Sequence, residues 1–254
     1  MRTLILGDVH GAYKALTQVL ERANYDPNGD HLIFLGDVAD GWPQTKECFD
    51  FIVDQPNKTY LLGNHDSWLL DWARFKTSTG SSCYYPEDIW WTQGGKETVR
   101  SYYPDIYTPW QALKIAAPKI PEAHFNLLND AKLYHVQDNC LFVHAGVYPG
   151  LPMEEQTEED LIWNMDLWGN RILWSFALER KNIEGENLTS FKEAFIGHTS
   201  TWTYSKIPIK ACEIWNLDQG CGWEGKLSIM DFETKEYWQS DITKTLYPGE
   251  AGRR

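Results

Sequence analysis

The sequence has little that would direct the protein to a membrane, to disulfide bonding or to a nucleic acid. None of its apolar runs is long enough to span a bilayer. Basic residues are scarce, with 23 Lys and Arg against 36 Asp and Glu and a formal net charge of -13, which argues against a nucleic-acid backbone as the main partner. An odd number of cysteines without a Cys-x-x-Cys pair or a signal peptide predicts reduced thiols in the cytoplasm. The five are Cys48, Cys83, Cys140, Cys212 and Cys221.

Low-complexity segments and long linkers are also missing, which predicts a single domain over residues 1–254. Within it, residues 76–121 alternate polar turns with aromatic residues and predict a helical insertion. This insertion either packs a small core of its own or forms a wall or lid over a site on the nearby loops. Trp163, Trp168 and Trp174 are expected to anchor the core. Residues 249–254 are expected to fray.

The most informative stretch lies near the N-terminus, at Gly7-Asp8-Val9-His10-Gly11. The apolar run over residues 4–6 predicts a buried strand, and residues 13–23 have the spacing of an amphipathic helix. Asp8 and His10 are therefore expected on a loop at the carboxyl end of a strand, where open α/β sheets bind their ligands. Residues i and i+2 of an extended chain point the same way, so a carboxylate and an imidazole can hold one metal ion.

The same arrangement, a short strand followed by a polar side chain, recurs along the chain. Four more predicted strands lead into such a residue: 31–35 into Asp37, 59–62 into Asn64, 140–143 into His144, and 194–196 into His198. Parallel strands place these loops along one edge of a sheet. Later segments predict antiparallel pairing, with a hairpin over 131–143 and strands at 227–230 and 236–238. Together they indicate an α/β fold, a sandwich of two sheets flanked by helices.

Five strand ends that present oxygen and nitrogen donors are what a site for two metal ions needs. Carboxylate, amide and imidazole ligands without thiolate suit manganese, iron or zinc better than magnesium or calcium. We expect two divalent transition-metal ions, manganese first, with iron and zinc as alternatives. If Asp37 bridges two cations roughly 3.5–4 Å apart, they share a hydroxide whose formation they favour by lowering the pKa of bound water.

The polar motifs, taken in order, resemble those of a known family. Gly-Asp-x-His-Gly, Gly-Asp-x-x-Asp, Gly-Asn-His-Asp, His-Ala-Gly and Gly-His-Thr are similar to the motifs of the calcineurin-like metallophosphoesterases, and they run from residue 7 to residue 199. Within that family the resemblance is to the phosphoprotein-phosphatase branch, which includes bacterial and phage Ser/Thr phosphatases and symmetrical diadenosine tetraphosphatases. The resemblance implies an αββα sandwich with a dinuclear metal centre.

The resemblance also implies roles for individual residues. The first metal ion would be held by Asp8, His10 and Asp37, and the second by Asp37, Asn64, His144 and His198. His65 would protonate the leaving oxygen, because the pKa of a histidine lies near the working pH. Asp40 would orient His65. Considered without the resemblance, Asp40 is a turn residue before Gly41, and His65 is a neighbour of a helix N-cap.

The sequence departs from the family pattern at the arginines that bind phosphate. Gly41 stands where the pattern Gly-Asp-x-x-Asp-Arg-Gly has an arginine. A second family arginine is also missing from residues 161–165. Arg171 is the first candidate for a replacement, followed by Lys96 and Arg100 in the insertion.

These observations predict a metal-dependent phosphoesterase that hydrolyses phosphomonoesters, phosphoserine and phosphothreonine among them, by attack of a metal-bridging hydroxide. The expected partner is a phosphorylated protein or small molecule. Hydrolysis of diadenosine polyphosphates or of phosphodiesters is the alternative. A metal-containing binding protein without turnover is a second alternative.

Overall fold

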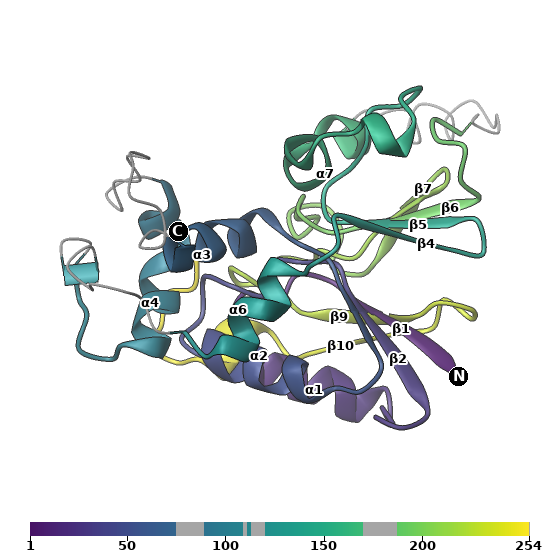
Figure 1. The fold of residues 1–254 in the computed structure, drawn as a ribbon. Coiled ribbons are helices and arrows are strands. Elements are labelled where there is room, and N and C mark those ends of the chain that lie inside the picture. The colour runs from purple at the N-terminus through teal and green to yellow at the C-terminus, as the bar shows by residue number, and fades with distance from the viewer. Residues whose placement is uncertain (75–88, 109–110, 113–119, 170–186, 254) are drawn as a thin grey trace.

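Two mixed β-sheets face each other at the centre of the protein (Figure 1). The computed structural model describes residues 1–74, 89–108, 111–112, 120–169 and 187–253. The first sheet has the strand order β10-β9-β1-β2-β3, and the second has the order β4-β5-β6-β8-β7. The strands are β1 (Arg2–Leu6), β2 (Asp30–Phe34), β3 (Lys58–Tyr60), β4 (Tyr134–Gln137), β5 (Cys140–Val143), β6 (Glu193–Ile196), β7 (Ile209–Ala211), β8 (Ile214–Asn216), β9 (Ser228–Asp231) and β10 (Tyr237–Gln239).

In each sheet, parallel strands form the part that leads to the polar loops. β1, β2 and β3 run parallel, and their register pairs Leu6 with Phe34 and Phe34 with Tyr60, so all three finish at the same edge. β5, β6 and β8 also run parallel, while β4 and β7 are antiparallel at the two sides. The predicted hairpin is confirmed as β4 and β5, joined by Asp138 and Asn139, which both have positive φ.

Helices cover the outer faces of both sheets, and the predicted αββα sandwich is confirmed. α1, α2 and α6 lie on the outer face of the first sheet, and α7 lies on the side of the second sheet (Figure 1). The helices are α1 (Tyr13–Arg22), α2 (Thr45–Asp54), α3 (Asn64–Arg74), η1 (Trp91–Gly95), α4 (Lys96–Tyr102), α6 (Glu122–Asn129), η2 (Met153–Glu155), α7 (Glu158–Trp163) and α9 (Thr243–Leu246). None of the helices in the described ranges is both long and apolar enough to cross a membrane.

Apolar side chains from both sheets form the core between them. Ile5 and Ile33 from the first sheet belong to the same buried cluster as Phe142 and Phe195 from the second. The rings of Phe142 and Phe195 are stacked, with centroids 5.1 Å apart. Because β-branched and aromatic residues pack well on a pleated surface, this core fixes how the two sheets, and hence the loops at their edges, face each other.

The described part of the insertion does not form the separate small core that was one of its two predicted arrangements. Trp90, Val99 and Ala112 belong to the same buried cluster as α1, α2 and the first sheet, so the described part of the insertion does not pack a separate core. Its boundaries at 76 and 121 stay a prediction. Of the tryptophans expected in the core, Trp168 is buried, Trp163 is 39% exposed, and Trp174 lies outside the described residues.

Candidate metal centre

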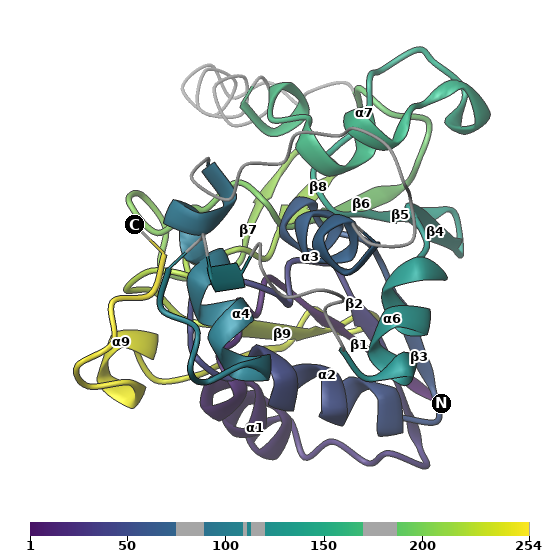
Figure 2. The same ribbon diagram turned by 60° about the vertical axis from the view of Figure 1, so that its left-hand side comes forward.

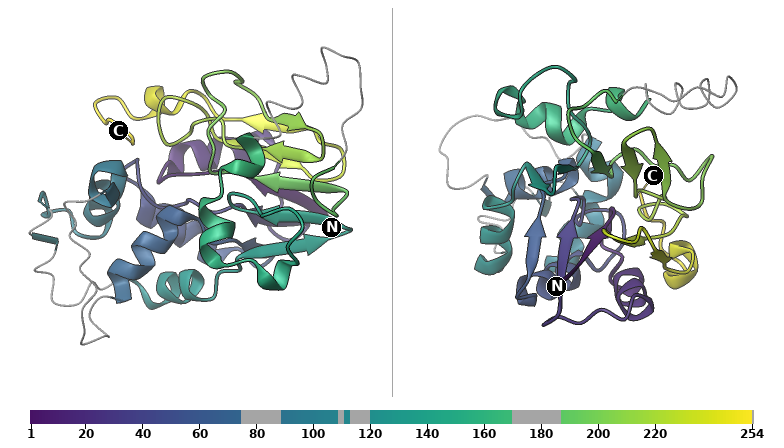
Figure 3. Two further views of the ribbon diagram at one scale, coloured as in Figure 1. Left: turned by 90° about the horizontal axis from the view of Figure 1, so that it is seen from above. Right: turned by 90° about the vertical axis from the view of Figure 1, so that its right-hand side faces the viewer.

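Polar side chains from five strand ends meet at one edge of the two sheets. This edge, where β1, β2 and β3 finish, lies at the end of the protein away from the N-terminus and near the C-terminus (Figure 3). Two sets of three side chains with metal-ligand atoms lie here, and within each set these atoms are within 4.8 Å of one another. The two sets share Asp37.

The first set consists of Asp8, His10 and Asp37, all buried. His10 Nδ1 donates a hydrogen bond to the carbonyl oxygen of Ala39 at 3.1 Å, and Arg253 Nη1 donates to His10 Nε2 at 3.1 Å. Because a guanidinium can only donate, these bonds assign the ring proton to Nδ1 and leave a lone pair on Nε2. That Nε2 atom lies 3.8 Å from Asp8 Oδ2 and 3.7 Å from Asp37 Oδ2. The set therefore offers one imidazole nitrogen and two carboxylate oxygens.

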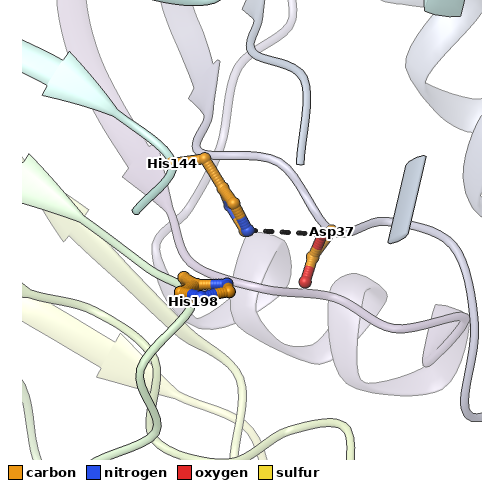
Figure 4. Close-up of side chains that lie close together, drawn as sticks. All are labelled: Asp37, His144 and His198. Atoms are coloured by element: carbon orange, nitrogen blue, oxygen red, sulfur yellow. Dashed lines mark ion pairs between the residues drawn. The ribbon is translucent and has the colours of Figure 1, made fainter. Parts of the chain in front are cut away.

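The second set consists of Asp37, His144 and His198 (Figure 4). His144 Nδ1 donates to the carbonyl oxygen of Leu35 at 2.8 Å, and its Nε2 lies 3.4 Å from Asp37 Oδ1. The side-chain oxygen of Asn64 lies 3.0 Å from His144 Nε2 and 2.9 Å from His198 Nδ1. Asn64 thus joins this set, which offers two imidazole nitrogens, an amide oxygen and a carboxylate oxygen.

Asp37 lies between the two sets and presents one oxygen to each. Its Oδ1 accepts from the backbone N–H of His65 at 2.9 Å on the side of His144, and its Oδ2 is on the side of His10. Oδ2 is buried and has no hydrogen-bond partner. An ionised oxygen without a donor is costly in the interior unless a cation contacts it. Both donor sets therefore fit divalent transition-metal ions.

The charges at the site also favour cations. Burial by itself raises the pKa of Asp37, but the neighbouring His144, His65 and His10 together outweigh it and hold this pKa well below its usual range. Burial opposes a charge on His144, yet Asp37 and then Asp8 raise its pKa to about 9. Burial lowers the pKa values of His10 and His198 to about 3, which keeps both rings neutral and able to bind metal at neutral pH. Because a raised pKa favours a proton on His144, protons and metal ions compete for this imidazole.

Several of these side chains are oriented by unusual backbone conformations. His10, Asp37, Asp40 and His198 have φ values of 51°, 52°, 69° and 63°, in the left-handed region that residues with a Cβ rarely adopt. Such conformations cost about 1–3 kcal/mol each and persist only where the surroundings hold them. Here the backbone N–H groups of Val9 and His10 both donate to the carbonyl oxygen of Asp37, at 3.0 and 2.9 Å.

His65 and Asp40 form a buried pair beside the two sets. His65 Nδ1 lies 2.7 Å from Asp40 Oδ2, and His65 Nε2 is buried without a hydrogen-bond partner. Burial lowers the pKa of His65 well below its usual value and raises that of Asp40, although hydrogen bonds from Thr98 and Trp90 to Asp40 act in the opposite direction. Because Asp40 receives donors from three side chains, we assign it as a carboxylate.

The insertion supplies two of those three donors. Thr98 Oγ1 donates to Asp40 Oδ1 at 2.7 Å and accepts from the backbone N–H of Asp40 at 2.8 Å. Trp90 Nε1 donates to Asp40 Oδ2 at 2.9 Å. Gly94 packs directly against Gly41, because a Cβ built on Gly94 would lie 2.2 Å from the Gly41 nitrogen. The insertion thus reaches the site and holds one of its acidic groups.

Two acidic residues beside the site were missed by the sequence analysis. Asp66 accepts hydrogen bonds from the backbone N–H groups of Val38 and Ala39, both at 2.9 Å, so it holds the loop that carries Asp37. Asp218 follows β8 and has a buried Oδ2 without a hydrogen-bond partner. The signal for Asp218 was present, since an acidic residue follows a short strand there as it does after β1 and β2.

Most of the chain matches one protein family. The model of the calcineurin-like phosphoesterases matches residues 1–198. The chain belongs to the calcineurin-like phosphoesterase family. The predicted activity is confirmed at this level: the protein is a metal-dependent phosphoesterase, a hydrolase that acts on phosphoester bonds.

This phosphoesterase is similar in sequence or in structure to proteins with several different names. The symmetrical bis(5'-nucleosyl)-tetraphosphatase of Haemophilus ducreyi is 24% identical over 299 residues, which span 96% of this chain and 100% of the relative. An enzyme of the same name from Actinobacillus pleuropneumoniae serotype 5b is 39% identical over 71 residues, 28% of this chain and 26% of the relative. A crystal structure described as that of a candidate diadenosine tetraphosphatase has a TM-score of 0.62 at 18% identity, covering 94% of this chain and 92% of that one. A protein serine/threonine phosphatase from Saccharomyces cerevisiae has a TM-score of 0.56 at 11% identity, covering 95% and 79%. At these identities the structural likeness shows the fold.

Two of the residues suggested as replacements for the missing arginine, Lys96 and Arg100, make no hydrogen bond or ion pair with the metal-ligand sets in the part of the phosphoesterase that the structure describes. Arg171 lies outside the described residues. Lys96 and Arg100 lie on α4 on either side of Thr98, and the Arg100 guanidinium packs over the ring of Tyr107 at 5.3 Å. Their role in binding substrate stays a prediction.

The C-terminal segment, which was expected to fray, is instead fixed beside the site as far as Arg253. The ring of Tyr247 stacks on that of Trp42, with centroids 5.1 Å apart. The backbone N–H of Arg253 donates to the carbonyl oxygen of Gly222 at 2.7 Å. The expectation was wrong because composition shows the polar and small residues of this segment but not the aromatic pair that anchors it.

Proposed function

We propose that this phosphoesterase hydrolyses phosphomonoesters at a dinuclear metal centre. Asp8, His10 and Asp37 hold one divalent cation, and Asp37, Asn64, His144 and His198 hold the other. The observation that supports this most is the position of Asp37, which presents one oxygen to each set and has a buried oxygen without a donor. Manganese is the expected metal, with iron or zinc as alternatives. Bound cations supply an activated water and offset the negative charge of the phosphoryl oxygens.

In this proposal His65 delivers a proton from Nε2 to the leaving oxygen. Its Nδ1 is held by Asp40, so Nε2 is the nitrogen available to the substrate. Burial favours the neutral ring in the free protein, whereas the negative charge of a phosphoester beside Nε2 favours the imidazolium form. The carboxylate of Asp40 stabilises that imidazolium and keeps the ring in position.

The experiment that tests the proposal is a substrate panel. Protein stripped with a chelator and reloaded with Mn, Zn or Mg is assayed on p-nitrophenyl phosphate, its bis-ester, a phosphoserine peptide and diadenosine tetraphosphate. We expect the highest kcat/KM on monoesters and no activity with chelator present. Activity on the bis-ester or the dinucleotide alone would contradict the proposal.

A second candidate substrate is a dinucleoside polyphosphate, and Trp163 favours it. This side chain is 39% exposed, and its ring lies edge-to-face with that of His198 at 6.0 Å. An exposed indole beside the site is a surface on which a nucleobase can stack. The full-length relatives with 24–25% identity are also named as tetraphosphatases. If this candidate is right, Trp163→Ala raises KM for diadenosine tetraphosphate while leaving KM for p-nitrophenyl phosphate unchanged.

We further propose that the substrate, a phosphorylated protein or small molecule, is met in the cytoplasm. The cysteines within the described residues, Cys48, Cys140, Cys212 and Cys221, are free thiols. Free thiols persist where reductants keep them reduced, which supports this location. Alkylation of intact cells followed by mass spectrometry of the protein would test it, with modified Cys212 as the expected result.

A further inference from the structure

The guanidinium group of Arg253 lies at the edge of the candidate metal centre. Its Nη1 donates to His10 Nε2 at 3.1 Å, and its Nη2 donates to Gln93 Oε1 at 2.8 Å. Its Cζ lies 4.2 Å from the centre of the Trp223 ring, so the group packs against the indole. Figure 2 shows the C-terminal segment passing from α9 towards the insertion. Arg253 is therefore fixed in place and turned towards His10.

Two glycines leave room for this side chain. A Cβ built on Gly41 would lie 3.2 Å from Arg253 Cγ, and one built on Gly222 would lie 2.8 Å from Arg253 Cδ. A Cβ at Gly222 would require a shift of the Arg253 side chain, and a Cβ at Gly41 would press tightly against it. Gly41 is also the position at which the family pattern has its phosphate-binding arginine. The space next to that position is taken here by an arginine from the other end of the chain.

Arg253 makes no ion pair with an acid of the described residues, although its charge acts against the rise in pKa that burial causes at Asp40 and Asp218. Within the described residues no carboxylate lies within ion-pair distance of its guanidinium, and Arg253 Nε is buried without a hydrogen-bond partner. Its two acceptors, His10 Nε2 and Gln93 Oε1, are both uncharged. In a chain with a net charge of -13, a partly buried guanidinium without an anion at contact distance is positioned to bind an anionic ligand.

We propose that Arg253 binds the phosphoryl oxygens of the substrate and does the work of the arginine that is absent at position 41. This inference rests on the proposed function, because the phosphoryl group must lie at the metal centre for Arg253 to reach it. A guanidinium is planar and offers parallel N–H donors that match two oxygens of one phosphoryl group. The packing on Trp223 fixes that plane before the substrate arrives, which reduces the entropy lost on binding.

Metal binding and phosphate binding are linked through His10 in this arrangement. One lone pair on His10 Nε2 cannot both accept from Arg253 and bind a cation. A cation at His10 would therefore free Arg253 Nη1 to donate to a phosphoryl oxygen. Arg253 is thus expected to contribute to phosphate binding in the metal-loaded protein and much less in the metal-free protein.

Calorimetric titration with inorganic phosphate tests the proposal. The proteins are wild type, Arg253→Ala and Arg253→Lys, each loaded with manganese and each also stripped of metal. Arg22→Ala is the matched control, because Arg22 pairs with Asp241 and ties the C-terminal part of the chain to α1 without reaching the site. We expect Arg253→Ala to raise the Kd for phosphate roughly 10- to 100-fold in the loaded protein, with the lysine variant between. We expect Arg22→Ala to have no effect.

Metal content and thermal unfolding of each variant separate this role from a structural one. Unchanged phosphate affinity in Arg253→Ala at full metal content would overturn the inference. So would loss of phosphate affinity together with loss of metal, because Arg253 would then act by positioning His10. If wild type hydrolyses no phosphoester but Arg253→Ala still weakens phosphate binding, the proposed function fails and this inference stands. If wild type hydrolyses monoesters and Arg253→Ala binds phosphate normally, only this inference fails.

Discussion

Replacing His65 with alanine should slow hydrolysis most where the leaving group most needs a proton. His65 Nε2 is buried and without a partner, and Nδ1 is held at 2.7 Å by Asp40, so the ring is positioned for a single proton transfer. General acid catalysis contributes on the order of 10²–10⁴ in rate, which corresponds to about 2.7–5.4 kcal/mol. We expect a loss of this size in kcat for phenyl phosphate, because phenolate is about as basic as a tyrosinate. p-Nitrophenolate is a far weaker base, so p-nitrophenyl phosphate should lose much less.

The same substitution should also lower stability, which decides the assay temperature. It removes one hydrogen bond to the buried carboxylate of Asp40 and leaves Thr98 and Trp90 as its remaining side-chain donors. We expect the free energy of unfolding to fall by about 1–3 kcal/mol, so both substrates are assayed well below the Tm of the variant. His31→Ala is the control, since His31 is half-buried and hydrogen-bonds Thr59 outside the site. Equal losses on both substrates at unchanged metal content would refute the acid role.

Three further predictions concern the metal, the insertion and pH. Asp37→Ala should remove at least half of the metal found by elemental analysis, and full retention of metal in this variant would rule out bridging. Chelation of the wild type should lower its Tm, because metal that binds only the folded state stabilises that state. Thr98→Val should reduce kcat on phenyl phosphate without changing metal content, since it removes the hydrogen bond that Thr98 donates to the Asp40 carboxylate and the one it accepts from the Asp40 backbone. Thr92→Val on the same insertion is its control, and an equal effect of both would point to general damage. Glu193→Gln should lower stability at neutral pH but not at acid pH. Burial raises the pKa of Glu193, but hydrogen bonds from two lysines outweigh burial and lower this pKa to about 2. The carboxylate therefore stabilises the fold above pH ~4.5, and this stabilisation is lost as the pH falls towards 2. If the difference in Tm between wild type and Glu193→Gln does not narrow on acidification, this reasoning is wrong.

The strand ends could be predicted from the sequence because each carries a local signal. An apolar run that leads into a polar residue, through a glycine at four of the five strand ends, specifies both a strand and the point at which it finishes, and parallel pairing then brings such points to one edge. The six proposed metal ligands were named in this way, and the structure brings them together. Asp218 also follows a strand, but the polar Asn216 interrupts the apolar run before it and no glycine marks the end of that strand.

Contacts between distant segments could not be predicted in this way. Arg253 reaches His10 only because Gly41 and Gly222 leave space and because Tyr247 stacks on Trp42. The sequence around each of these residues gives no sign of these contacts, which form only after the two sheets bring the loops together. The same holds for the hydrogen bonds between the insertion and Asp40. Hydrophobic periodicity indicates which residues are buried, but it does not indicate the hydrogen-bond partner of a buried tryptophan or threonine.

The hydrogen bonds from Trp90 and Thr98 to Asp40 limit how this insertion could be exchanged between relatives. A chimaera that received a different insertion would keep all its metal-ligand residues, yet it would leave a buried carboxylate short of two side-chain donors. Such a protein would bind metal and still position His65 poorly. We therefore expect an exchanged insertion to be accepted in this protein only when it brings its own donors for Asp40, or when Asp40 is replaced together with the insertion.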